Sequence, residues 1–178
     1  MFLQKPNISL NEFLTPGEIC DIIQLQYHPQ IESACTSINV FLAQNPLINE
    51  LPVSVSEMVQ LLFSKLQDDI KHLCLKEKVI LLPYIKSISK NKEIITGYTE
   101  TEKNILTVIA DTQKLIIATA EKIRVLLNDY FIQREWSAEF KHCVTDMKCL
   151  ETKILEWITV EHHFLYPKVI ANTNINFN

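Results

Sequence analysis

Glycine is nearly absent from this chain, with two residues in 178. Sandwiches and barrels of β-strands need turn residues roughly every 8–12 positions, so this scarcity excludes them. Few glycines suit long helices that are joined by few loops. A chain of 178 residues is also long enough to bury the core of one domain.

Long apolar runs and clustered charge are also missing. No stretch of about 18 apolar residues is present, so nothing is expected to span a membrane. The net charge is −4, and no basic stripe favours a nucleic acid or a membrane surface as a partner. Met1 to Pro6 contain no apolar run of roughly 7–15 residues, so they do not resemble a secretory signal. We therefore expect a cytoplasmic protein.

The cysteines are odd in number, and no C-x-x-C pair occurs among the five. Small buried hydrophobic residues in a reducing compartment are the expected role, and a cysteine nucleophile or a zinc site is the alternative. The five are Cys20, Cys35, Cys74, Cys143 and Cys149.

Four segments carry apolar residues at a helical period of about 3.6. We expect helices over 15–44, 54–89, 99–127 and 136–169. Capping boxes predict three of the starts, at Thr15 with Glu18, Ser54 with Glu57 and Thr99 with Glu102. Pro83 is expected to kink the second helix.

Four amphipathic helices with short connections predict an all-α, up-down-up-down four-helix bundle. The bundle is expected over residues 15–172, between a short N-terminal arm at 1–14 and a C-terminal tail at 173–178.

Each helix has one polar residue within its apolar seam: His28, Glu77, Gln113 and Glu161. The other expected seam positions are Leu25, Ile31, Cys35, Ile38 and Leu42 in the first segment, Leu62, Leu66, Ile70, Leu73, Ile80 and Tyr84 in the second, Leu106, Ile109, Ile116, Ala120, Ile123 and Leu127 in the third, and Phe140, Cys143, Met147, Leu150, Ile154, Trp157 and Phe164 in the fourth.

The helical rise of about 1.5 Å per residue places Gln113 level with Glu77 and puts His28 within about 8 Å of that level. Glu161 matches this level less well unless the fourth helix begins later than residue 136. Two carboxylates in an apolar core need a cation, a shared proton or a local opening to water. One imidazole with oxygen ligands suits iron, manganese or zinc.

Two of these segments resemble a known family. Glu77-Lys78-Val79-Ile80-Leu81-Leu82-Pro83 is similar to E-E-x-I-L-F-P, and Val160-Glu161-His162-His163-Phe164-Leu165-Tyr166-Pro167 is similar to L-E-N-N-x-L-F-P. Both patterns are typical of the hemerythrin-like (HHE cation-binding) family, nearest the branch of di-iron proteins that repair iron–sulfur clusters after nitric oxide or oxidative stress. Tyr27-His28 resembles the Y-H of its first helix.

The resemblance implies a bundle that holds two irons through one histidine from each helix and two bridging glutamates. His28 falls on the first-helix histidine, and Glu77 and Glu161 fall on the two glutamates. The other three histidine positions hold Leu73, Gln113 and Trp157. The implied iron site is therefore incomplete, and at most a reduced, mononuclear centre is expected on His28, Glu77, Glu161 and Gln113.

Three other histidines lie near the pattern without matching it. His72 is one residue, or about 100° of helix, away from the ligand position before Glu77. His162 and His163 adjoin Glu161 and are expected to be exposed, with an inward turn of one ring as the alternative.

Three functions remain open at this point. The first is an iron-binding protein of the repair type or an oxygen or nitric-oxide sensor. The second is a metal-free bundle that acts through protein contacts, as a homodimer or with another protein partner. The third, an enzyme that uses Glu77 and Glu161 for acid–base catalysis, has no support beyond the pair itself, so no catalytic residue is assigned.

Overall fold

The computed structural model describes residues 14–44, 47, 50–90 and 100–173. The N-terminal arm, the C-terminal tail beyond residue 173 and the connection at 91–99 lie outside the described residues. Within the described part, every regular element is helical and no strand occurs. The expected fold class, all-α, is confirmed at this level.

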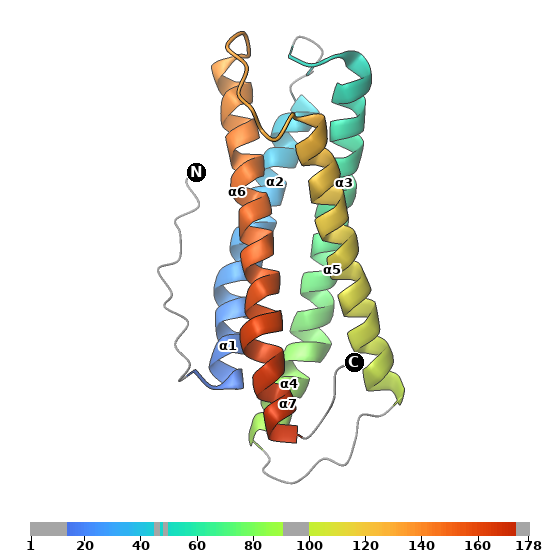
Figure 1. Ribbon diagram of the computed structural model, residues 1–178, viewed down its shortest axis with the longest axis vertical. Coiled ribbons are helices and arrows are strands. Elements are labelled where there is room, and N and C mark those ends of the chain that lie inside the picture. The colour runs from blue at the N-terminus through green and yellow to red at the C-terminus, as the bar shows by residue number, and fades with distance from the viewer. Residues whose placement is uncertain (1–13, 45–46, 48–49, 91–99, 174–178) are drawn as a thin grey trace.

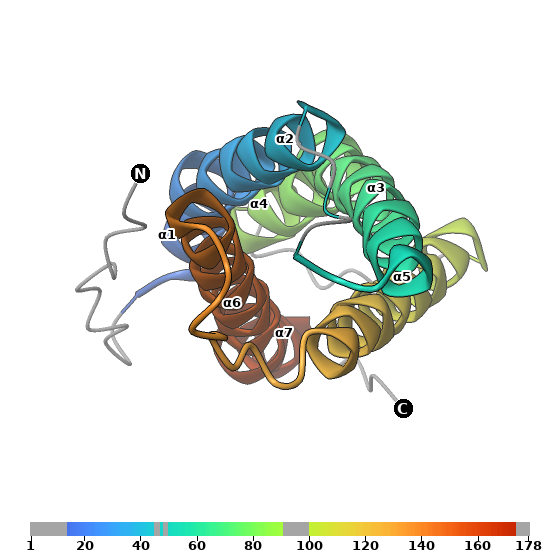
Figure 2. The same ribbon diagram turned by 90° about the horizontal axis from the view of Figure 1, so that it is seen from above.

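Four helical rods lie side by side around a common core (Figures 1 and 2). The first rod is α1 (Pro16–Ile22) continued by α2 (His28–Gln44), and the second is α3 (Val53–Lys76) continued by α4 (Leu82–Lys90). The third is α5 (Glu100–Leu126), and the fourth is α6 (Ala138–Val160) continued by α7 (Tyr166–Thr173). Contacts join α2 to α3, α3 to α5, α5 to α6 and α6 to α2, which closes the ring seen in Figure 2.

Helix starts follow the capping signals in part. Thr15 and Glu18 form the expected capping box, with Glu18 N–H donating to Thr15 Oγ1 at 3.3 Å. The box expected at Ser54 is wrong, because α3 begins at Val53 directly after Pro52, which has no side-chain cap. The fourth helix begins at Ala138 rather than at 136, with Ser137 as its cap. The box at Thr99 lies outside the described residues.

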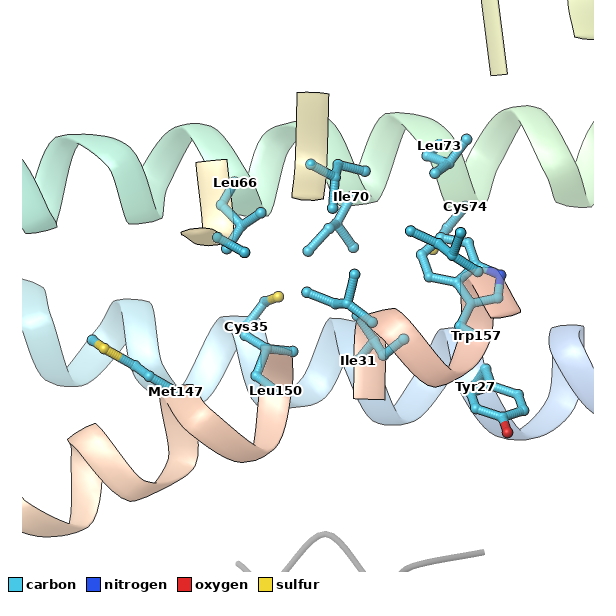
Figure 3. Packing of buried hydrophobic residues seen from close by; sticks show 14 of the residues in the cluster. Tyr27, Ile31, Cys35, Leu66, Ile70, Leu73, Cys74, Met147, Leu150 and Trp157 are labelled. Carbon is cyan, nitrogen blue, oxygen red and sulfur yellow. The ribbon is translucent and has the colours of Figure 1, made fainter. Parts of the chain in front are cut away.

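Apolar side chains from all four rods form the core, part of which Figure 3 shows. Figure 3 shows side chains of α2, α3 and α6 pointing toward one another, with Trp157 reaching toward Leu73 and Cys74 of α3. Four of the five cysteines are buried as expected, and Cys149 is exposed. Among the described residues, no helix combines the length and the apolar character needed to cross a lipid bilayer.

The connection from α5 to α6 begins with three residues in the left-handed region, Asn128, Asp129 and Tyr130, with φ of 49°, 55° and 61°. This connection is tied to the one between α2 and α3 at the same end of the molecule. Trp136 Nε1 donates to the Glu50 carbonyl at 2.8 Å, and the Ser137 N–H donates to the Glu50 carboxylate at 3.1 Å.

Three rods contain one wider, π-helical turn of five residues: η1 (Ile23–Tyr27), η3 (Glu77–Leu81) and η4 (Glu161–Leu165). In each, the first carbonyl accepts the N–H five residues later instead of four. A proline follows two residues after each of these turns, at Pro29, Pro83 and Pro167. Proline has no N–H to donate and its ring crowds the carbonyl four residues back, which a wider turn relieves.

These π-helical turns correct part of the expected core. Each turn inserts one residue into the helical period, which rotates the following side chains by about 100°. Leu81 and Leu165 are therefore buried in place of Ile80 and Phe164, and Ile80 is 42% exposed. Leu25, expected in the first seam, lies inside η1 and is 70% exposed for the same reason.

Candidate functional site

The four polar seam residues meet in the core, one from each rod. His28 is the first residue of α2, and Glu77 and Glu161 are the first residues of η3 and η4. Gln113 comes from the middle of α5. Their exposed fractions are 3% for His28, 2% for Gln113 and 0% for each glutamate. We call these four residues the polar centre.

Hydrogen bonds link the polar centre across the rods. His28 Nε2 lies 2.9 Å from Glu77 Oε2, and Gln113 Nε2 donates to Glu161 Oε2 at 2.5 Å. The two carboxyl groups also lie close enough together for each to shift the pKa of the other. Glu161 therefore lies at the same height along the bundle as Gln113, although the expected helix bounds matched the two poorly. The fourth helix begins later than expected, at Ala138.

Burial dominates the charge state of the polar centre. It raises the pKa of Glu77 to about 8, against an ordinary value of 4.5. Burial, the neighbouring charge of Glu77 and the interaction of a protonated Glu161 with the Glu77 carboxylate hold the pKa of Glu161 well above its ordinary value. A carboxyl group with a pKa of about 8 is mostly protonated at neutral pH, so the pair retains at least one proton there.

The imidazole of His28 is neutral, because burial lowers its pKa. Its Nδ1 has no hydrogen-bond partner within the described part of the chain. A buried N–H without a partner is rarer than a buried acceptor without one, so the proton belongs on Nε2. The Nε2–H of His28 therefore donates to Glu77 Oε2.

Two residues that the sequence did not assign to the site also bind Glu161. Trp157 Nε1–H donates to Glu161 Oε1 at 3.0 Å, and the Tyr166 hydroxyl donates to Glu161 Oε2 at 3.3 Å. Trp157 was expected only as an apolar filler at a lost ligand position. Its spacing of four residues before Glu161 places both side chains on one helical face, and that spacing was the available signal.

The remaining histidines lie outside the polar centre. His72, His142, His162 and His163 are all exposed residues. His162 Nε2 nevertheless lies 2.9 Å from Gln113 Oε1, and its ring packs edge to face on Tyr166 with centroids 5.2 Å apart. His162 thus contacts the centre from its outer edge through Gln113.

The donor set of the polar centre does not fit the di-iron site that the resemblance implies. Within the described residues, no three side chains of His, Cys, Asp or Glu converge as ligands of one ion. Both oxygens of Glu161 face hydrogens, from Trp157 on one side and from Gln113 and Tyr166 on the other. Leu73 is fully buried where a further imidazole would have to lie.

Comparison with known proteins gives no independent assignment, since no family model and no curated protein matches this chain.

Proposed function

We propose that this chain is a hemerythrin-like, up-down-up-down four-helix bundle that holds its two core carboxyl groups with protons and hydrogen bonds instead of metal, and that it acts through contacts with other proteins. The observation that carries the proposal is the set of hydrogens around Glu161. An indole N–H, a carboxamide N–H and a hydroxyl point at oxygens that would otherwise bind a cation.

The hydrogen bonds give both oxygens of Glu161 the partners that they need. A buried polar atom without a partner costs about 1–3 kcal/mol, and an unpaired buried charge costs more. Protonation of the carboxyl groups avoids the cost of an unpaired charge, and the hydrogen bonds from Trp157 and Gln113 avoid the cost of unpartnered oxygens at Glu161. The polar centre then serves to fix which faces of the four rods meet.

Elemental analysis of the purified, chelator-free chain tests this proposal. We expect no stoichiometric metal, even after anaerobic incubation with ferrous iron, and an unfolding transition that a chelator does not change. A stoichiometric amount of iron, or a chelator that lowers the melting temperature, would overturn the metal-free centre.

The exposed apolar residues near η3 support a role in protein contacts. Leu75, Val79 and Ile80 are 58%, 62% and 42% exposed. The π-helical turn rotates Ile80 out of the core, so the feature that buries Leu81 also adds Ile80 to these exposed apolar residues. Large exposed apolar groups that lie together are typical of interaction surfaces.

A second copy of this chain is the first partner to test. Light scattering with size exclusion measures the oligomeric state, and Val79→Lys is expected to weaken a dimer that Glu57→Lys, on an exposed site of α3, leaves intact. A wild-type chain that is monomeric at every concentration would exclude the homodimer and leave a different protein as the partner.

A reduced metal centre of the repair or sensing type is the second candidate function. The observation that favours it is Glu77, whose Oε1 faces no donor in hydrogen-bonding geometry within the described residues, while its Oε2 contacts His28. One ion on His28, Glu77, Glu161 and Gln113 would use that oxygen. Stoichiometric metal that is lost on Glu77→Gln would establish this candidate in place of the first.

A further inference from the structure

The indole of Trp157 lies among the three side chains of the polar centre that are able to ligate a metal. Its N–H donates to Glu161 Oε1 at 3.0 Å and lies close enough to the Glu77 carboxyl group to lower its pKa. Its ring packs edge to face on the His28 ring, with centroids 5.0 Å apart and an interplanar angle of 75°. Trp157 is fully buried, so its ring occupies part of the core beside these side chains.

The three donors on Glu161 differ in what they could offer a cation. The carboxamide of Gln113 carries an oxygen as well as an N–H, and the hydroxyl oxygen of Tyr166 has lone pairs. Either group can accept a cation after a rotation. The indole of Trp157 is a donor only, so it cannot become a ligand in any rotamer.

We infer that Trp157 is the residue that keeps a divalent cation away from His28, Glu77 and Glu161, and that shortening its side chain opens a site for one cation among them. One imidazole and two carboxylates suit a first-row divalent ion. The polar space left by the indole admits water, which completes the coordination. The inference rests on the proposed function, in which the wild-type centre holds no metal.

Cobalt(II) binding to the full chain tests this inference, because the bound ion has its own visible absorption. Trp157→Ala removes the ring and the N–H together. Ile154→Ala, also buried and on the same helix, is the matched control for loss of core volume. We expect Trp157→Ala to bind one equivalent of cobalt at least about tenfold more tightly than wild type or the control. Bound cobalt should raise its melting temperature.

Two further variants keep the test decisive. Trp157→Leu retains an apolar side chain, and it replaces the alanine variant if circular dichroism shows that the latter does not fold. Glu77→Gln in the Trp157→Ala or Trp157→Leu background should abolish the cobalt spectrum, because it removes a carboxylate ligand.

A folded Trp157 variant that binds cobalt no better than the control would overturn the inference, and so would binding that survives Glu77→Gln. These results leave the metal-free wild-type centre untouched. Wild-type protein that binds cobalt as tightly as the variants would instead overturn the proposed function itself, so the two failures are distinguishable.

Discussion

Replacing Glu77 by glutamine should make folding less sensitive to pH. The carboxamide keeps an oxygen for the His28 N–H, 2.9 Å away in wild type, and offers its own N–H to Glu161. In wild type, burial raises the pKa of Glu77 to about 8 from an ordinary 4.5. Between these two values the folded chain holds a proton that the unfolded chain releases. Stability therefore falls as pH rises through this window.

The size of the effect follows from this linkage. One such proton changes the free energy of unfolding by about 1.4 kcal/mol per pH unit. Between pH 5 and pH 7, Glu77 thus lowers the free energy of unfolding by at most about 3 kcal/mol. The raised pKa of Glu161 also makes the free energy of unfolding fall as pH rises, and the substitution at Glu77 leaves this contribution in place. From pH 5 to pH 7, the free energy of unfolding should therefore fall less for Glu77→Gln than for wild type, by up to about 3 kcal/mol.

Urea unfolding at several pH values from 5 to 8, in the presence of a chelator, measures this difference. Glu57→Gln, on an exposed site of the same helix, controls for the loss of one carboxyl group. Parallel curves for wild type and Glu77→Gln would refute the reasoning, because they would mean that folding does not change the proton affinity of Glu77. A large destabilisation by Glu77→Gln at every pH would do the same.

Three other substitutions test the fold. Thr15→Ala should lower stability by about 1 kcal/mol in thermal unfolding, because it removes the capping hydrogen bond to Glu18; an unchanged melting temperature would mean that α1 does not depend on its cap. Gln67→Leu should cost about 1–2 kcal/mol in urea unfolding, because the Asn39 amide loses an acceptor at 2.7 Å; a neutral result would mean that Asn39 finds water instead. Asn128→Gly should raise stability by about 0.5–1 kcal/mol, because its φ of 49° suits glycine; a loss of stability would show that the asparagine side chain holds the turn.

Helical content was the most predictable feature. The scarcity of glycine and the apolar period are local properties of the chain, and they suffice to predict four rods close to their true bounds. The cap expected at Ser54 was wrong by two residues, because Pro52 precedes the first residue of the helix, Val53, without a side-chain cap.

The apolar period alone did not predict which side chains are buried after Glu77 and after Glu161. A regular period places Ile80 in the core, whereas η3 buries Leu81. The wider turn forms just before Pro83, which has no N–H to donate to the helix. Packing of the residues that follow compensates for the missing hydrogen bond. In the sequence, a proline occurs six residues after each of Ile23, Glu77 and Glu161. The structure shows that each of these residues begins a π-helical turn, so this spacing was the available sign of the turns.

The sequence by itself determined that four amphipathic helices each carry one polar group into a shared core, because both properties follow from residue type and spacing along one helix. Tertiary structure decided how these groups are satisfied. Gln113 and Glu161 come from different rods, and Trp157 and Glu161 meet only in the rotamers that this core allows. Whether a buried carboxyl group faces a cation or a hydrogen depends on such contacts between rods, and the order of residues along one helix does not specify them.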